Sequence, residues 1–331
     1  MNKIIEIKPA KYKIVGNQAF LIEIKKNCKL FQMPKTIENE GKEYIVTTIS
    51  DNAFLGCEKI KFLTIPNNII HIGHSAFAFC YKLKNITISN SASYIGDSAF
   101  KYCTSLKEIV IPDNVNYIGL NCFEGCEKLK SIQLPKKLKV ISEFCFSSCY
   151  SLKKITIPDE VTTIQEGAFN YCVCLKNINI PKKVVCIGKD AFYGCVELTK
   201  FNNGKYYKGF NSDLTCRKFQ YKENEWFETD GKVELCVNGF HACHSPFYIF
   251  NYYYGTINKE VLFYEVDLDE VTGEDTINDF SLKNRTLNKS NLNNSEELTP
   301  IYTLPTSMIC AKRIKLIKRY NSYSDLFKEF F

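Results

Sequence analysis

Apolar residues recur with a fixed period of 23 residues along the first part of the chain. The most regular element is an aromatic residue followed three positions later by a cysteine, which occurs seven times from Phe54/Cys57 to Phe192/Cys195. Between successive pairs, alternating apolar residues such as Ile109 and Ile111 are typical of a short strand with one buried face. A repeat of this length predicts stacked coils, because one coil is too small to bury its own apolar face.

The remaining positions of the repeat predict how each coil turns. A proline directly follows the strand in five coils, where its missing N–H ends the strand without harm. A bend with unusual backbone dihedrals is predicted at one glycine position, occupied by Gly73, Gly96, Gly119 and Gly188. The A-F-x-x-C segment predicts a short helix or 3₁₀ turn with its apolar face inward. Its cysteines fall at equivalent positions, so we expect a column of buried thiols between the coils.

The repeat, written I-P-x-x-V-x-x-I-G-x-x-A-F-x-x-C, resembles that of BspA-like leucine-rich-repeat proteins over residues 24–203. The resemblance implies an α/β solenoid of the leucine-rich-repeat type, with seven coils in residues 43–203. Residues 1–42 would form an N-terminal β cap and a first partial repeat, because the first coil needs a cover. The alternating stretches Ile4–Ile7 and Phe20–Ile24 fit this cap, and an insertion in the first unit predicts a hairpin through Glu40-Gly41-Lys42.

Composition sets a few further limits on function. The chain has 331 residues and a formal net charge of +7, which is milder than the basic excess of a dedicated nucleic-acid binder. The N-terminus has no signal-peptide pattern, and no stretch is long and apolar enough to span a membrane. We therefore expect a cytoplasmic protein with 16 reduced cysteines, the alternative being a secreted disulfide scaffold. No P-loop, dinucleotide-binding glycine pattern or H-E-x-x-H motif occurs.

One repeat position carries lysine in six successive coils: Lys61, Lys84, Lys107, Lys130, Lys153 and Lys176. Neighbouring strands lie about 4.8 Å apart, so these ammonium groups would form a ladder along one edge of the solenoid. Such a ladder would attract an acidic protein surface, a nucleic acid or another polyanion. The alternative is that lysine is an ordinary solvent-facing residue here, offset by Glu58, Glu108 and Glu127. His71 and His74, at variable repeat positions, are interpreted as ordinary surface residues.

From residue 204 the repeat is absent, and all four arginines of the chain lie beyond this point. Residues 204–331 predict a separate α+β domain. Its expected elements are strands around Tyr206, Phe219–Tyr221, Val261–Leu268 and Ile314, helices at 246–253 and from Ser324, and a mobile loop over 270–300. The motifs T-C-R-x-F-Q-Y and L-C-x-x-G-F-H-A-C-x-x-P resemble an uncharacterised domain of bacterial and phage proteins, a resemblance that implies no activity.

Three hypotheses compete for the chemistry of the G-F-H-A-C cluster. Cys236, His241, Cys243 and His244 could ligate zinc, although paired C-x-x-C spacing is missing. Cys243 with either histidine could be a nucleophile and its base, although no oxyanion site is evident. The order of G-F-H-A-C, a helix and a strand is also similar to part of the ADP-ribosyltransferase fold, which binds NAD. Arg217 and His241 would be tested first for that activity, but an H-G-T-like motif and a convincingly placed glutamate are missing.

These patterns favour a protein-interaction scaffold. The solenoid would present a ligand-binding face, and the C-terminal domain would be an accessory or effector unit. We expect a protein partner with an acidic surface, with nucleic acid as the alternative partner, and we assign no metal and no cofactor. The alternative function is an enzyme whose C-terminal domain modifies a target chosen by the repeats. It would be ADP-ribosyltransferase-like, with NAD as its cofactor and Arg217, His241 and Cys243 as candidate catalytic residues.

Overall fold

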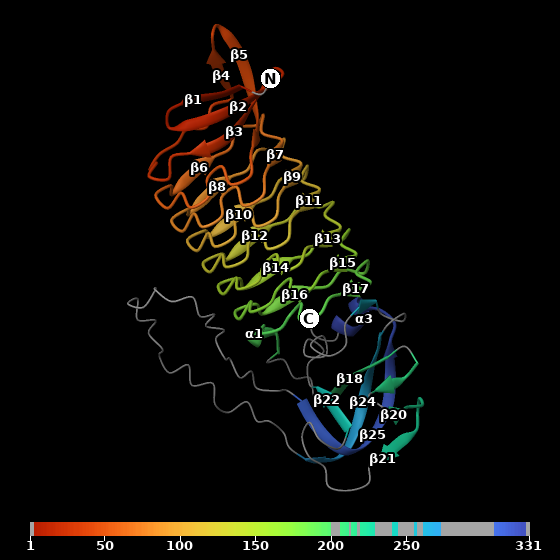
Figure 1. Ribbon diagram of the computed structural model, residues 1–331. Coiled ribbons are helices and arrows are strands. Elements are labelled where there is room, and N and C mark those ends of the chain that lie inside the picture. Colours follow the sequence, from red (N-terminus) through yellow and green to blue (C-terminus); the bar gives the residue numbers. More distant parts are fainter. Residues whose placement is uncertain are drawn as a thin grey trace, which may run out of the picture.

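Two columns of short parallel strands run along the solenoid, one on each side (Figure 1). The computed structural model describes residues 3–199, 206–211, 213–216, 219–228, 240–243, 255–256, 261–272 and 308–328. The first column comprises β6 (Phe62–Thr64), β8 (Asn85–Thr87), β10 (Glu108–Val110), β12 (Ser131–Gln133), β14 (Lys154–Thr156) and β16 (Asn177–Asn179). The second column comprises β5 (Lys42–Ile49), β7 (His71–Ile72), β9 (Tyr94–Ile95), β11 (Tyr117–Ile118), β13 (Val140–Ile141), β15 (Thr163–Ile164) and β17 (Cys186–Ile187).

Residues pair across neighbouring coils at the predicted spacing. Leu63 lies opposite Ile86 in the first column, and His71 lies opposite Tyr94 in the second. This register confirms the leucine-rich-repeat solenoid. The coils consist of strands and turns, and the solenoid ends in α1 (Val196–Thr199), a helix of four residues.

A three-stranded antiparallel sheet covers the first coil. It contains β1 (Lys3–Ile7), β2 (Ala10–Val15) and β3 (Gln18–Ile24), and β3 pairs in parallel with β5. The hairpin through Glu40-Gly41-Lys42 is confirmed: it joins β4 (Thr36–Asn39) to β5, and Glu40 and Gly41 have positive φ angles of 55° and 71°. Strand β2 is not among the predicted strands, although every second residue of it is buried.

The repeated phenylalanines form one continuous stack inside the solenoid. From Phe54 to Phe192 the ring centroids lie 4.7–5.6 Å apart, and the rings are at most 1% exposed. From Cys80 to Cys195, each repeat cysteine donates its Sγ–H to the carbonyl oxygen of the phenylalanine in the preceding coil, at 3.1–3.3 Å. Each of these carbonyl oxygens also accepts from the backbone N–H of the cysteine in its own coil. The thiol therefore adds a second, weak hydrogen bond that links neighbouring coils.

The predicted column of buried thiols is therefore confirmed. The twelve cysteines between residues 3 and 199 are all free, so no disulfide framework holds these coils together. The coils are joined by backbone hydrogen bonds and by packing, as expected for a solenoid whose stability is a sum over neighbouring coils.

The repeat glycines are required by the close approach of neighbouring coils, so the predicted unusual dihedrals are wrong. None of the four glycines has a positive φ angle, but a Cβ atom at Gly119 would lie 2.4 Å from the amide nitrogen of Asp97 in the preceding coil. Positive φ angles occur instead in the A-F-x-x-C region, as at Ser98 (57°) and Tyr102 (56°). Glycine at one repeat position can mean either a bend with unusual dihedrals or too little room for a side chain beside the next coil. The sequence pattern is the same in both cases.

The A-F-x-x-C segments are hydrogen-bonded turns rather than helices. The Cys103 N–H donates to the Phe100 carbonyl oxygen at 3.1 Å, which is the single bond of a 3₁₀-type turn. The positive φ angle of Tyr102 prevents a longer helical run. The Phe100 N–H donates to the Cys122 carbonyl oxygen of the next coil at 2.9 Å. The helix alternative is therefore wrong, because bonds between coils replace the bonds that a helix would make within itself.

The described part of the C-terminal domain is a small sheet that closes on itself. Its strands are paired in the order β21-β25-β22-β18-β24, and β24 pairs again with β25. The strands are β18 (Tyr206–Asn211), β21 (Trp226–Glu228), β22 (Phe240–Cys243), β24 (Val261–Thr272) and β25 (Met308–Tyr320), with β19 (Thr215–Cys216) and β20 (Phe219–Gln220) as a separate pair.

These elements confirm the strands predicted around Tyr206, Phe219, Val261 and Ile314. The last helix, α3 (Tyr323–Phe327), is also confirmed, with Ser322 as its N-cap. The helix predicted at 246–253 lies outside the described residues. Most of the loop predicted over 270–300 lies outside them too, and residues 270–272 belong to β24.

The C-terminal domain covers the last coil of the solenoid. Strand β23 (Gly255–Thr256) pairs antiparallel with β17, and Phe263, Tyr323 and Phe327 belong to the same buried core as the coils. The core of the solenoid therefore continues into the C-terminal domain, which also has a smaller core of its own around Phe210 and Leu316. Within the described ranges, no helix combines the length and the apolar character needed to cross a membrane.

Candidate functional site

The six repeat lysines lie in register along one edge of the first strand column, and all of them are exposed. Backbone hydrogen bonds connect them from coil to coil. The N–H of Lys84 donates to the oxygen of Lys61 at 2.8 Å, and the N–H of Lys130 donates to the oxygen of Lys107 at 2.8 Å. The structure therefore brings the six candidate binding residues together in one ladder. We name this surface the lysine edge: Lys61, Lys84, Lys107, Lys130, Lys153 and Lys176.

Residues beside the ladder add to its positive charge. The strips 58–62, 81–85, 104–108, 127–131, 150–154 and 173–177 together contain ten lysines and three glutamates. Among the described residues, one ion pair involves the lysine edge, between Nζ of Lys176 and Glu197 at 3.8 Å. Glu58, Glu108 and Glu127, which were expected to offset the charge of these lysines, form no ion pair with them within the described ranges. The edge presents a net positive surface.

A second surface lies on the other strand column, where three rings stack across coils. His71, Tyr94 and Tyr117 occupy the same register position of β7, β9 and β11. The ring centroids of His71 and Tyr94 lie 4.5 Å apart, and those of Tyr94 and Tyr117 lie 5.0 Å apart, with interplanar angles of 3° and 11°. Tyr117 is 39% exposed. The parallel rings form a stepped aromatic surface along the solenoid.

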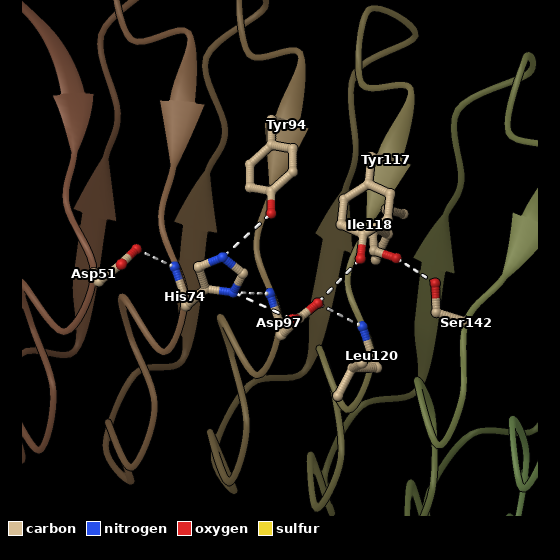
Figure 2. Close-up of polar contacts among 8 residues, drawn as sticks. All are labelled: Asp51, His74, Tyr94, Asp97, Tyr117, Ile118, Leu120 and Ser142. Carbon is tan, nitrogen blue, oxygen red and sulfur yellow. Dashed lines mark hydrogen bonds and ion pairs between the residues drawn. The ribbon is translucent and has the colours of Figure 1, made fainter.

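Hydrogen bonds fix the polar atoms of this surface (Figure 2). Oδ1 of Asp97 accepts from the Tyr117 hydroxyl and from the Leu120 N–H, each at 3.1 Å. Oδ2 of Asp97 lies 3.3 Å from Nδ1 of His74, which also accepts from the Asp97 N–H at 3.1 Å. Nε2 of His74 lies 3.4 Å from the Tyr94 hydroxyl. We name this surface the aromatic patch: His71, His74, Tyr94, Asp97, Tyr117 and Leu120.

The patch carries negative charge. Burial, the Asp97 carboxylate and its hydrogen bond raise the pKa of Tyr117 to about 12, so the phenol remains a donor at neutral pH. Burial lowers the pKa of His71 against the opposing effect of Asp51, which favours the neutral ring. The carboxylates of Asp97 and of neighbouring Asp51, which accepts from the His74 N–H at 2.7 Å, supply the charge.

The aromatic patch was missed in the sequence. His71 and His74, interpreted as ordinary surface residues, take part in a stacked and hydrogen-bonded cluster. The available signal was an aromatic ring at one repeat position in three consecutive coils, namely His71, Tyr94 and Tyr117. The position varies elsewhere along the repeat, and for that reason it does not stand out from the sequence pattern.

The candidate catalytic residues of the C-terminal domain are placed only in part. Arg217, Cys236 and His244 lie outside the described residues. His241 and Cys243 lie two positions apart on β22, which pairs with β25. Among the residues whose placement is described, no group of three or more His, Cys, Asp or Glu could hold a metal ion. The zinc, nucleophile and ADP-ribosyltransferase hypotheses therefore stay predictions.

A cavity of about 480 Å³ lies where α3 meets the last coils. Three lysines line it, of which Lys183 is paired with Glu160, and Lys328 with Asp325 at 2.8 Å. Because two of the three ammonium groups are already neutralised by carboxylates of the protein, we assign no ligand to this cavity.

Comparison with known families identifies the repeat. The family described as "BspA type Leucine rich repeat region (6 copies)" matches residues 13–141 and 93–214. The chain belongs to the BspA-type leucine-rich-repeat family. A further family, described as "Domain of unknown function (DUF7666)", matches residues 204–295. The BspA-type solenoid is thus followed by a domain to which the match assigns no activity, as the resemblance in the sequence implied.

Solved structures of leucine-rich-repeat proteins are similar to this chain over about three fifths of its length. A leucine-rich-repeat protein of T. pallidum is 28% identical with a TM-score of 0.54, over 59% of this chain and 91% of that chain. A leucine-rich cell-surface protein of Faecalibacterium prausnitzii A2-165 is 28% identical with a TM-score of 0.50, over 60% of this chain and 54% of that chain. The match spans about half the length of the second protein. The comparison with curated proteins gave no match.

Proposed function

We propose that this BspA-type protein is an interaction scaffold that binds an acidic protein along the lysine edge. The observation that carries the proposal is the ladder of six exposed lysines in register, within strips that hold ten lysines and three glutamates. The ammonium groups repel one another, because the strands that carry them lie only about 4.8 Å apart. A partner with several carboxylates would relieve this repulsion, and the attraction would also speed the encounter of the two proteins.

The strand face beside the lysine edge supplies a contact area. The outer position of each strand in the first column is exposed, and most of its residues are small or polar: Thr64, Thr87, Val110, Gln133, Thr156 and Asn179. Such residues leave backbone and side-chain groups open to a partner without forming a large apolar patch. The C-terminal domain, which shares its core with the last coil, supports this surface by closing the end of the solenoid.

Poly-L-glutamate is a suitable probe because it carries carboxylates on a polypeptide chain. We expect the full-length protein to bind it, and Lys84→Glu, Lys107→Glu and Lys130→Glu together to weaken binding roughly tenfold at low salt. The difference should shrink as salt screens the charges. The matched control reverses three exposed lysines outside the lysine edge, Lys29, Lys35 and Lys139, and changes the total charge equally.

Equal losses in the two triple variants would show that only the net charge matters, and the proposal would fail. A DNA duplex serves as the competing probe. Tighter binding of DNA than of poly-L-glutamate through the same lysines would assign the lysine edge to nucleic acid instead of an acidic protein.

A further inference from the structure

We infer that the aromatic patch is a second docking surface, which binds an arginine-bearing segment of a partner protein. The patch lies on β7, β9 and β11, whereas the lysine edge flanks the first column, which runs along the other side of the solenoid (Figure 1). The two surfaces have opposite charge. One solenoid therefore offers separate places for a basic and an acidic partner.

The rings of the patch are ordered before any partner arrives. Stacking holds His71, Tyr94 and Tyr117 at separations of 4.5 Å and 5.0 Å, and the Tyr117 hydroxyl is bonded to Asp97. Tyrosine has only two side-chain torsions, so little conformational entropy remains to be lost when a partner binds. Tyrosine is also among the residues that contribute most to binding at protein interfaces. The patch thus has the composition and the rigidity of an interface centre.

The carboxylate of Asp97 determines which partner fits. Its side chain keeps 30% of its surface exposed, and among the described residues Oδ2 contacts only the neighbouring His74 ring. Oδ1 already accepts two hydrogen bonds, which hold the carboxylate in place. A carboxylate fixed beside aromatic rings suits a guanidinium group, because arginine is planar, donates several hydrogen bonds and stacks on aromatic side chains. Lysine can form the ion pair but lacks the planar stacking surface.

A labelled oligo-arginine peptide tests this surface on the full-length protein, with fluorescence anisotropy as the measurement. Asp97→Asn keeps the shape of the side chain and an acceptor for the Leu120 N–H but removes the charge. We expect it to weaken binding about tenfold, as for the loss of one charge-assisted hydrogen bond. Tyr94→Ala should also weaken binding, because it interrupts the ring stack.

Asp113→Asn is the matched control. The Asp113 carboxylate likewise accepts from a backbone N–H of the next coil, that of Lys136 at 3.0 Å, but it lies outside the patch. The affinity of Asp113→Asn for oligo-arginine should differ less than twofold from that of the native protein. An oligo-lysine peptide of equal length should bind the native protein more weakly than oligo-arginine does. Poly-L-glutamate binding and the melting temperature of each variant report whether the solenoid and its lysine edge are intact.

Three results would overturn the inference. These are the absence of oligo-arginine binding, an equal loss in Asp97→Asn and Asp113→Asn, and equal binding of oligo-lysine with the same dependence on Asp97. The second result would mean that the peptide senses only the general field of the solenoid, and the third would mean that the patch binds any cationic segment rather than an arginine-bearing one. None of them bears on the lysine edge, whose test uses a different probe and different residues.

Discussion

Replacing Gly119 by alanine should destabilise the solenoid by about 3 kcal/mol. The added Cβ atom would lie 2.4 Å from the amide nitrogen and 2.5 Å from the Cα atom of Asp97. Non-bonded contacts of this kind are normally about 3.5 Å or longer, so the two coils must separate by roughly 1 Å. That movement stretches two bonds between coils, from the Gly119 N–H to Ile95 (2.9 Å) and from the Leu120 N–H to Asp97 (3.1 Å).

The magnitude follows from these contacts. Two weakened hydrogen bonds cost about 1 kcal/mol each, and overpacking adds about 1–3 kcal/mol. The lower entropy of the unfolded alanine chain returns about 0.4–1 kcal/mol. Ser142 occupies the same position in the next coil, where its hydroxyl donates to the Ile118 carbonyl oxygen at 2.5 Å (Figure 2). Three coils thus accept a Cβ atom at this position, at Ser50, Ser142 and Gln165. The side chains of Ser142 and Gln165 make a hydrogen bond to the preceding coil, which alanine at position 119 cannot make.

The matched control is Gly56→Ala. Gly56 has a φ angle of +68° but no atom within 4 Å of its added Cβ, and the equivalent residues Phe79 and Tyr102 carry side chains at positive φ. Its cost should therefore be about 1 kcal/mol, from the left-handed backbone alone. Urea unfolding followed by circular dichroism measures both variants. If Gly119→Ala loses no more stability than Gly56→Ala, the repeat glycines are not required by the close packing of neighbouring coils.

Three further predictions concern the cysteine column and the C-terminal domain. Cys126→Ala removes the Sγ–H bond to the Phe100 carbonyl oxygen, which keeps its bond from the Cys103 N–H, and it leaves a small cavity. It should cost about 1–2 kcal/mol in urea unfolding, and an unchanged stability would show that the thiol does not stabilise the stack of coils. Burial raises the pKa of Cys57 to about 11 and of Cys80 to about 12 from 9.0, so the unfolded chain releases these protons first. The stability that these protonated thiols contribute should be fully present below pH 9 and should be lost as pH rises toward 12. A melting temperature that stays constant across this range would contradict the prediction. Deleting residues 204–331 removes Phe263 and Phe327 from the shared core and should lower the melting temperature and promote aggregation by light scattering, unless an equally stable monomer shows that the cover is dispensable.

The two candidate surfaces differ in how far the sequence reveals them. The lysine edge was predictable because lysine recurs at one repeat position, and the strand register turns a period into a ladder. The aromatic patch was not, because it combines repeat positions that differ from coil to coil. Asp97 becomes important only because Tyr117 and Leu120, twenty or more residues away in sequence, reach it from the next coil. Such a cluster forms only where neighbouring coils carry different residues at equivalent repeat positions and these residues can bond to one another.

The sequence by itself determined the solenoid, its period, the strand positions and the inward phenylalanines and cysteines. A residue and its counterpart one period later have the same environment, so the repeat pattern is a direct record of the contacts between coils. Only the tertiary structure decided why glycine is required at Gly119, how the A-F-x-x-C turns bond to the next coil, and how β23 and α3 close the last coil. The glycine contacts and the turn bonds recur from coil to coil, but a period in the sequence does not reveal how closely two coils approach or which groups bond between them. The contacts of β23 and α3 with the last coil are made once, and a contact made once leaves no period in the sequence.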